Sequence, residues 1–377
     1  MKKTRVLRAI TWLPVGGIER RIVEVLPRLD CARFDVSLVC LRERGPLADE
    51  LEAAGVRVDC IPFRRRWDFA AIRRLAALMR EREIDVVHSH MYRGNVPATV
   101  AARLAGVRRV WGQVHNINTW ETRRQAWVDR ALCRWRAGMI GVSERVCRDI
   151  ERTLRLPPER VRLIHNGVNL ERFGRGEGRS ELRAEWGVGP DDVVILFAGR
   201  MVEPKRPGDF LDVARRLQEL EARRGGSTRL HFVLAGDGPL LPPMRERAAS
   251  LPAPERARLL GRRDDMPRVM AAADLFILPS SREGFSNALL EAMASGLAIV
   301  ATDVGGNVEA VRDGLDGRIV PAGDLEALRR ETERIAFDAD ARRAFAESAR
   351  ARAREFSLEA MIDKLQSLYE EPAPERK

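Results

Sequence analysis

Short apolar runs alternate with amphipathic stretches along the chain, and this alternation constrains the fold more than any other feature of the sequence. The stretches Glu19–Leu29, Phe69–Arg82 and Thr122–Ala137 carry apolar residues at helical spacing. The apolar runs of the first half have strand length and lie at Val6–Ile10, Val36–Leu41, Val56–Ile61, Asp85–Ser89, Val110–Val114, Met139–Val142 and Val161–Ile164. Strands that alternate with helices are typical of a parallel sheet with crossover helices. The sequence therefore predicts a doubly wound α/β fold.

The alternation is interrupted once, by the polar segment Glu171–Arg183, which follows His165–Asn169. A second series of strand-like runs comes after it, at Val193–Ala198, Leu230–Ala235, Leu259–Leu260, Leu275–Leu278, Ile299–Ala301 and Arg318–Val320. A chain of 377 residues rarely folds around one core. We therefore predict two doubly wound, Rossmann-like domains, residues 1–168 and 169–356, and a last helix over Leu358–Tyr369.

The stretch Ala273–Gly306 contains the most informative candidate site. A strand-like run there is followed by a polar loop, a helix-like segment that begins at Asn287, and a second apolar run. Glu283 lies on the loop, and Glu291 lies on the helix face that it shares with Asn287. Ligands of open α/β sheets bind at the carboxyl ends of the strands. We therefore expect both glutamates near a substrate; an acid/base pair like that of a glycosidase is the alternative.

Two cations follow the first strand of the second series. Gly199 and Arg200 end this strand, and Lys205 follows shortly after. A guanidinium can bind two phosphate oxygens at once, and an ammonium adds a point charge, so the pair suits a diphosphate. The next strand ends in a tight turn that contains Gly236 and Gly238.

Candidate residues of the first half follow three of its strands. Gly16 and Gly17 come after the first strand and precede a helix, where backbone N–H groups can bind an anion. His115 ends a later strand, and a single histidine in such a place is more often structural than functional. His88 and His90 alternate around a serine beside the end of the fourth strand and are rival candidates.

The loop and helix within Ala273–Gly306 resemble the E-x7-E motif of retaining glycosyltransferases of the GT-B fold. The residues that carry this resemblance are Glu283, Gly284, Phe285, Asn287 and Glu291. The longer run from Pro279 to Pro321 is similar to glycosyltransferase family four, the glycosyltransferase group 1 family. The resemblance implies two Rossmann-like domains that face each other across a cleft. It also implies that a helix over residues 357–372 returns to pack on the first domain.

The resemblance also assigns roles to the candidate residues. Arg200 and Lys205 would bind the donor's diphosphate. His115 would contact the donor sugar near the reacting centre, and Glu283 would contact the sugar hydroxyls. Glu291 would bind the ribose hydroxyls, and N–H groups at the helix start would hold a phosphate. The donor-binding residues that it implies are Gly16, Gly17, Gly199, Gly236, Gly238, Gly284, Phe285, Ser286, Asn287, Ala288 and Glu291.

The implied reaction moves a sugar from a nucleoside diphosphate sugar to an acceptor hydroxyl, with retention of the anomeric configuration. The cations would stabilise the leaving diphosphate, and the hydroxyl would attack on the leaving-group side with the leaving phosphate as base. Side chains would neutralise the phosphates, so we expect no cofactor and no metal, and no cluster has metal-ligand spacing. Glycan or lipid-linked acceptors of cell-envelope polysaccharide, lipopolysaccharide or glycolipid synthesis are implied, while the base and the sugar stay open.

The net charge of +11 is concentrated in the first half of the chain. Residues 1–165 hold 33 Lys and Arg against 19 Asp and Glu, whereas the remainder holds 33 basic and 36 acidic residues. This half should face an anionic partner, which could be nucleic acid, phospholipid headgroups or a phosphorylated acceptor, and a membrane surface is our hypothesis. An arginine-rich segment between aromatic residues, Phe63–Trp67, is the proposed anchor, extended by Arg108, Arg109, Arg123 and Arg124.

Two other functions remain alternatives at this point: a nucleotide-sugar epimerase of the same fold, and a basic nucleic-acid-binding protein. The chain lacks zinc, helix-turn-helix and RRM signatures, so we expect no nucleic acid. Its five cysteines form no C-x-x-C pair, and it shows neither a signal peptide nor a membrane-spanning run. We expect a cytoplasmic protein, with peripheral association with the inner face of the membrane as a further hypothesis.

Overall fold

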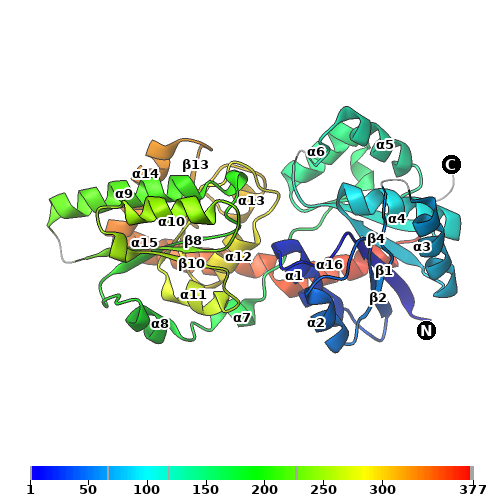
Figure 1. Ribbon diagram of the computed structural model, residues 1–377, viewed down its shortest axis with the longest axis horizontal. Helices are drawn as coiled ribbons and strands as arrows, with labels where there is room; N and C mark the ends of the chain where they lie inside the picture. Colours follow the sequence, from blue (N-terminus) through cyan, green and yellow to red (C-terminus); the bar gives the residue numbers. More distant parts are fainter. Residues whose placement is uncertain (1, 66–67, 118, 226–227, 374–377) are drawn as a thin grey trace. The chain divides into compact units, whose positions relative to one another are not determined.

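The computed structural model describes residues 2–65, 68–117, 119–225 and 228–373, and the chain divides into two compact units. The N-terminal unit comprises Met1–Asn166 together with Leu358–Lys377, and the C-terminal unit comprises Gly167–Ser357 (Figure 1).

The described part of the N-terminal unit is built on a parallel sheet with the strand order β3-β2-β1-β4-β5-β6-β7. The strands are β1 (Thr4–Ile10), β2 (Phe34–Cys40), β3 (Arg57–Cys60), β4 (Val86–His90), β5 (Arg109–Val114), β6 (Gly138–Gly141) and β7 (Val161–Leu163). After β1 the chain adds β2 and β3 on one side of the sheet and β4 to β7 on the other, so the strand order reverses between β1 and β4. Doubly wound proteins bind ligands at such a reversal.

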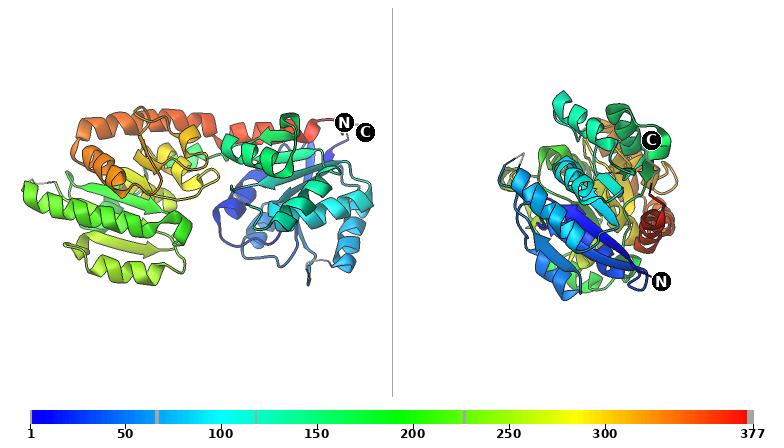
Figure 2. Two further views of the ribbon diagram at one scale, coloured as in Figure 1. Left: turned by 90° about the horizontal axis from the view of Figure 1, so that it is seen from above. Right: turned by 90° about the vertical axis from the view of Figure 1, so that its right-hand side faces the viewer.

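Helices cover both faces of this sheet, as Figure 2 shows. They are α1 (Gly17–Val25), α2 (Leu47–Ala53), α3 (Phe69–Glu81), α4 (Met91–Ala105), α5 (Arg123–Cys133), α6 (Glu144–Leu154) and α16 (Leu358–Glu370). One core cluster joins β1 and β4 to α1, α2 and α16, and a second joins the other face to α3 and α4. The predicted return of the last helix to the first domain is confirmed.

The described part of the C-terminal unit repeats this plan with the strand order β10-β9-β8-β11-β12-β13, again all parallel. The strands are β8 (Val193–Ala198), β9 (Leu230–Ala235), β10 (Ala257–Gly261), β11 (Leu275–Leu278), β12 (Ala298–Thr302) and β13 (Arg318–Val320). The helices are α7 (Leu170–Gly174), α8 (Arg179–Glu185), α9 (Pro207–Arg224), α10 (Leu241–Ala249), α11 (Met266–Ala272), α12 (Asn287–Ala294), α13 (Asn307–Ala310), α14 (Leu325–Phe337) and α15 (Ala339–Ala353). The order reverses between β8 and β11.

The predicted fold class, two doubly wound α/β domains, is confirmed, and the differences are local. The helix expected over Glu19–Leu29 ends at Val25 and continues as a 3₁₀ turn that contains Pro27, since proline has no N–H for a helical hydrogen bond. Thr122 does not join the next predicted helix. Its hydroxyl caps α5 by accepting a hydrogen bond from the Gln125 N–H.

Candidate active site

The candidate site of the C-terminal unit lies where the strand order reverses, at the carboxyl ends of β8 and β11. The loop after β8 contains a short 3₁₀ turn, η3 (Glu203–Lys205), and the loop after β11 carries Glu283. The two loops are joined because the Ser281 N–H donates to the Pro204 carbonyl at 2.8 Å. This backbone link holds the predicted diphosphate and sugar residues on neighbouring loops.

Lys205 and Glu283 form an ion pair across this reversal. The Lys205 ammonium donates to Glu283 Oε1 at 2.6 Å, and the two side chains are 18% and 8% exposed. The Ser280 hydroxyl donates to the same oxygen at 2.6 Å. The carboxylate is thus fixed from two sides, while the partly accessible ammonium can change partners when an anion binds.

Arg200 lies on the same loop as Lys205, and the residue is exposed. In the ranges that the structure describes, its guanidinium takes part in no hydrogen bond or ion pair with another residue. Arg206, by contrast, is bound to Asp209 at 2.6 Å. Arg200 is therefore a cation whose donors are available to a ligand.

Glycines bring the loop backbones of this site into contact. Gly236 has a φ of +141°, and a Cβ atom added there would lie 1.8 Å from the Gly199 carbonyl oxygen. Gly238, with a φ of +150°, would place a Cβ 2.5 Å from the Met201 carbonyl oxygen. Only glycine fits such positions. At Gly199 itself an added Cβ would meet nothing closer than 3.6 Å, so packing does not explain that glycine.

The helix α12 begins beside Glu283, as the sequence predicts. The buried Ser286 caps it, accepting a hydrogen bond from the Leu289 N–H at 3.4 Å. Asn287 and Ala288, both half-buried, form its first turn, and Glu291 follows one turn later and is also half-buried. The site thus has a helix N-terminus close to its cations and acids.

Two further candidates before α12 have structural contacts. Phe285 is buried against Phe356 with 5.4 Å between the ring centroids. Gly284, also buried, accepts a hydrogen bond through its carbonyl from the Gly306 N–H at 2.8 Å. These contacts hold the loop that carries Glu283.

Sequence reasoning missed the residues that support this loop. Gly305 has a φ of +53°, and a Cβ there would lie 2.1 Å from the Glu283 carbonyl oxygen. The Thr302 hydroxyl donates to the Ser280 carbonyl at 2.6 Å. The adjacent glycines 305 and 306 were a visible signal in the sequence, since paired glycines mark close backbone approach.

The first-domain glycines have a simpler structural role. Gly17 begins α1, and Gly16 precedes it with an extended backbone, φ −146°. A Cβ at Gly16 would meet the Glu19 carboxylate oxygen at 2.4 Å, the end of a flexible side chain. Neither glycine is among the described residues with positive φ. Their anion-binding role stays a prediction.

His115 belongs to a group of polar side chains at the strand-order reversal of the N-terminal unit. Its Nε2 lies 2.9 Å from Nδ1 of His90, and the two rings are stacked 5.2 Å apart. Nε2 of His90 accepts hydrogen bonds from Arg8, at 3.1 Å from Nε and 2.7 Å from Nη2. Burial lowers the pKa of His115 to about 3, with the Arg8 charge as the second cause.

The second part of this group centres on Tyr369 of α16. Its hydroxyl lies 2.7 Å from Arg8 Nη1 and 2.7 Å from His88 Nδ1, and His88 Nε2 lies 3.0 Å from Gln113 Oε1. Burial also lowers the pKa values of His88 and His90 well below the ordinary histidine value. The sequence pointed to the three histidines but not to Arg8, Gln113 or Tyr369.

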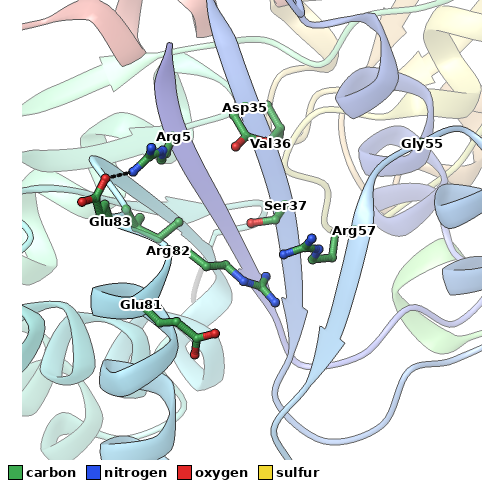
Figure 3. Close-up of a pocket in the computed structure, with 10 residues that line it drawn as sticks. Arg5, Asp35, Val36, Ser37, Gly55, Arg57, Glu81, Arg82 and Glu83 are labelled. Carbon is green, nitrogen blue, oxygen red and sulfur yellow. Dashed lines mark hydrogen bonds and ion pairs between the residues drawn. The ribbon is translucent and has the colours of Figure 1, made fainter. Parts of the chain in front are cut away.

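A hollow of about 470 Å³ lies in the N-terminal unit at the amino ends of β1, β2 and β3 (Figure 3). Among the charged residues that line it, Arg5 is paired with Glu83, and Arg82 is paired with Asp59. Because doubly wound sheets bind ligands at the carboxyl ends of their strands, we do not place the active site at these amino ends.

The proposed membrane anchor is only partly described, because Arg66 and Trp67 lie outside the described residues. Phe63 packs on the core of the N-terminal unit, so it is not an exposed anchor. Phe69 and Trp127 are 68% and 69% exposed instead. Among the described residues, no helix is both long enough and apolar enough to cross a bilayer. Within the same ranges, no group of His, Cys, Asp and Glu could hold a metal ion.

Two family models match successive parts of the chain. Residues 15–172 match "Glycosyltransferase Family 4", and residues 192–338 match "Glycosyl transferases group 1". With the two doubly wound units, these matches define a glycosyltransferase of the GT-B class. The chain belongs to the group 1 glycosyltransferases of family 4, as the resemblance in its sequence predicted.

Curated relatives are similar to most of the chain. The galactosyltransferase of Escherichia coli named UDP-Gal:alpha-D-GlcNAc-diphosphoundecaprenol alpha-1,3-galactosyltransferase is 27% identical over 337 residues, 86% of each protein. A D-inositol 3-phosphate glycosyltransferase of Streptomyces bingchenggensis is 29% identical over 364 residues, 86% of this chain and 77% of the relative. The matches support sugar transfer in glycan synthesis and give no support to the epimerase or nucleic-acid alternatives.

Solved structures share the fold. HepE of Anabaena in complex with UDP superposes with a TM-score of 0.84 and 20% identity, covering 97% of this chain and 99% of HepE. WaaG, a glycosyltransferase involved in lipopolysaccharide biosynthesis, has a TM-score of 0.75 and 18% identity, covering 97% of this chain and all of WaaG.

Proposed function

We propose that this chain is a retaining, metal-independent glycosyltransferase that moves a sugar from a UDP-sugar to the hydroxyl of a glycan or lipid-linked acceptor. The observation that carries the proposal is the ion pair between Lys205 and Glu283 at the strand-order reversal. Arg200 lies on the same loop as Lys205, and its guanidinium has no partner in the described ranges. A diphosphate at this place would meet two cations and the start of α12.

The chemistry follows from charge. As the bond to the leaving diphosphate breaks, negative charge grows on its oxygens, and fixed cations lower the barrier most where that charge develops. Lys205 would turn from Glu283 to a phosphate oxygen, which frees the carboxylate to accept hydrogen bonds from sugar hydroxyls. Arg200 would bind a second phosphate oxygen. Because side chains supply this positive charge, no divalent ion is required.

The relatives support uracil as the base of the donor, that is, a UDP-sugar. The E. coli relative is named for UDP-Gal, and solved HepE structures hold UDP and UDP-glucose. A thermal-shift screen against UDP-, GDP- and ADP-sugars tests the base, because a ligand that binds only the folded state raises the melting temperature. A shift with GDP- or ADP-sugars alone would contradict the uracil assignment.

Retention and metal independence need a separate test. The anomeric configuration of the new linkage, read by NMR from the product of an α-linked donor, should be α. The rate should be unchanged when EDTA is added to the protein. A β-linked product would contradict retention, and a loss of activity that Mg²⁺ or Mn²⁺ restores would contradict metal independence.

We further propose that the acceptor is presented at an anionic membrane surface. The E. coli relative is named for a diphosphoundecaprenol acceptor, which is a lipid. On this chain, α5 exposes Trp127 together with Arg123 and Arg124. An exposed tryptophan among arginines suits the headgroup region of a membrane.

A further inference from the structure

Arg8 is a buried guanidinium whose described side-chain partners are neutral groups. It lies in the middle of β1, is 2% exposed, and contacts the neutral groups of His90 and Tyr369. Among the described residues it forms no ion pair with a carboxylate. Arg136, which is also buried in this unit, is bound to Asp129 at 2.6 Å. The missing acid at Arg8 therefore points to a role other than structural charge pairing.

The contacts of Arg8 fix the protons of one pair of histidines. A guanidinium only donates hydrogen bonds, so Nε2 of His90, which faces Nε and Nη2 of Arg8, must be the acceptor. A neutral His90 then carries its proton on Nδ1 and donates it to Nε2 of His115 at 2.9 Å. His115, in turn, is left with its proton on Nδ1. Its depressed pKa agrees with a neutral ring.

A second branch leaves Arg8 through Tyr369. The Tyr369 hydroxyl accepts from Arg8 Nη1, so it donates its own proton to Nδ1 of His88. His88 then carries its proton on Nε2 and donates it to Gln113 Oε1 at 3.0 Å. This contact orients the Gln113 amide and leaves its NH₂ group at the end of the branch.

Both branches end in donors for which the described residues supply no partner. Nδ1 of His115 and Nε2 of Gln113 are buried and make no hydrogen bond in the described structure. Both residues line a cavity with about 10 Å³ of water-accessible space, together with Arg8, His90 and Asn166. This is room for about one oxygen atom. Buried donors without partners are rare and call for an explanation such as a bound group.

We propose that Arg8 is a positioning residue that fixes two histidine tautomers, so that His115 Nδ1–H and the Gln113 NH₂ group bind one acceptor oxygen of a ligand. A hydroxyl, carboxylate or phosphate oxygen suits this cavity, whereas an ammonium group, which only donates, does not. A role for this oxygen in sugar transfer rests on the proposed function. The relay, by which we mean the two chains of hydrogen bonds that start at Arg8, does not depend on that function.

Long-range ¹H–¹⁵N NMR spectra of the protein labelled with ¹⁵N-histidine test the relay without any sugar nucleotide. The chain has five histidines, which makes assignment by single substitution practical. We expect His90 and His115 to be protonated on Nδ1, and His88 on Nε2. His231 is an internal control, since its Nε2 faces the Asp192 carboxylate at 3.0 Å and should carry the proton. A spectrum with Nε2-protonated His90 or His115 would overturn the proposal.

Substitution separates a relay from simple packing. Arg8→Met should release His115 from the single Nδ1–H tautomer, and a spectrum unchanged from that of the parent protein would count against Arg8. Should Arg8→Met fail to fold, Tyr369→Phe serves instead. It cuts only the second branch, so His88 should lose its Nε2–H preference while His90 and His115 keep their Nδ1 protons. A change at His115 instead of His88 would contradict the two-branch arrangement.

Small probes test the class of ligand. Formate can place one acceptor oxygen in the cavity, whereas methylammonium offers only donors. Formate should shift the His115 Nδ1 signal with a saturable titration, Gln113→Leu should weaken that titration, and methylammonium should have no effect. An equal response to both probes, or none to formate, would overturn the acceptor-oxygen assignment. Since no UDP-sugar is used, either result is independent of the proposed transferase activity.

Discussion

The two units reverse their strand order in the same manner, yet the polar groups at the two reversals are of opposite kinds. In the C-terminal unit the partly accessible Lys205 is paired with Glu283, and the exposed Arg200 lies on the same loop as Lys205. In the N-terminal unit the buried Arg8 has, among the described residues, the imidazole of His90 and the phenol of Tyr369 as its side-chain partners. The first arrangement suits a multiply charged leaving group, because its cations can exchange partners. The second suits recognition of one neutral or anionic oxygen by groups whose protons are fixed in advance.

The largest expected effect is on catalysis in the C-terminal unit. Lys205→Ala should lower the turnover rate by about 10²–10³-fold, since a lost transition-state donor costs roughly 3–4 kcal/mol. It should also lower the melting temperature, because Glu283 keeps a buried charge without its ammonium. Arg216→Ala on α9 is the matched control, since that side chain is 63% exposed. Release of UDP from the donor identified by thermal shift is the measurement. Near-parental turnover in Lys205→Ala would be incompatible with the assigned diphosphate site.

Glycine substitutions should also distinguish the two units. Gly236→Ala should cost roughly 3–5 kcal/mol of unfolding free energy, because its Cβ would overlap the Gly199 carbonyl at a positive φ. Gly16→Ala should cost less than about 1 kcal/mol, because only a flexible carboxylate has to move. Urea unfolding monitored by circular dichroism gives both values. Similar costs at the two positions would mean that the glycines of the first domain are under a backbone constraint that the structure does not show.

The fold was predictable from the sequence because strands and helices depend on local patterns. The bounds of β8, β9, β11 and β13 agree with the predicted runs, and so does the start of α12 at Asn287. Lys205 and Glu283 were both candidate site residues. Their contact could not be predicted from local patterns, because the two residues lie 78 positions apart. The whole Arg8 branch to Tyr369 was missed for the same reason, as these two residues lie 361 positions apart. An arginine within an apolar strand was the one local signal.

Acid should destabilise the N-terminal unit before the C-terminal unit. The groups concerned are His88, His90 and His115, whose pKa values are lowered by burial and, second, by the charge of Arg8. Above the ordinary histidine pKa of about 6.5 the native and unfolded rings are both neutral, and the stability is fully present. As the pH falls below that value, only the unfolded chain binds protons. Each histidine then lowers the free energy of unfolding by up to about 1.4 kcal/mol per pH unit, and for His115 this continues down to a pH of about 3.

Hydrogen exchange at pH 7.5 and pH 5, corrected for the intrinsic exchange rates, measures this difference. Protection of β4 and β5 should fall more than protection of β8 and β9. The C-terminal unit has its own buried histidine, His231, but an aspartate opposes the lowering of its pKa. Equal losses in both units would show that the three histidines of the N-terminal unit do not control its acid stability.

The smallest expected effect concerns the membrane surface. Trp127→Ala should weaken binding to vesicles that contain phosphatidylglycerol. The double change Arg123→Ala with Arg124→Ala should weaken it by about 1 kcal/mol per basic residue. Flotation at low and high salt is the measurement, because exposed charges are screened by salt. The exposed Leu315 of the C-terminal unit provides a control substitution, Leu315→Ala. Unchanged flotation of both α5 variants would remove α5 from the proposed membrane surface.

The central claim, that the C-terminal unit holds a diphosphate between Arg200 and Lys205, is tested most directly by the affinity for UDP. Arg200 has no partner to lose in the described structure, so Arg200→Ala should leave the melting temperature unchanged. Calorimetry should show UDP binding weakened by about 10- to 100-fold, the loss of a charge-assisted hydrogen bond of roughly 1.5–3 kcal/mol. Parental affinity for UDP in this variant would contradict the assignment of Arg200 to the diphosphate.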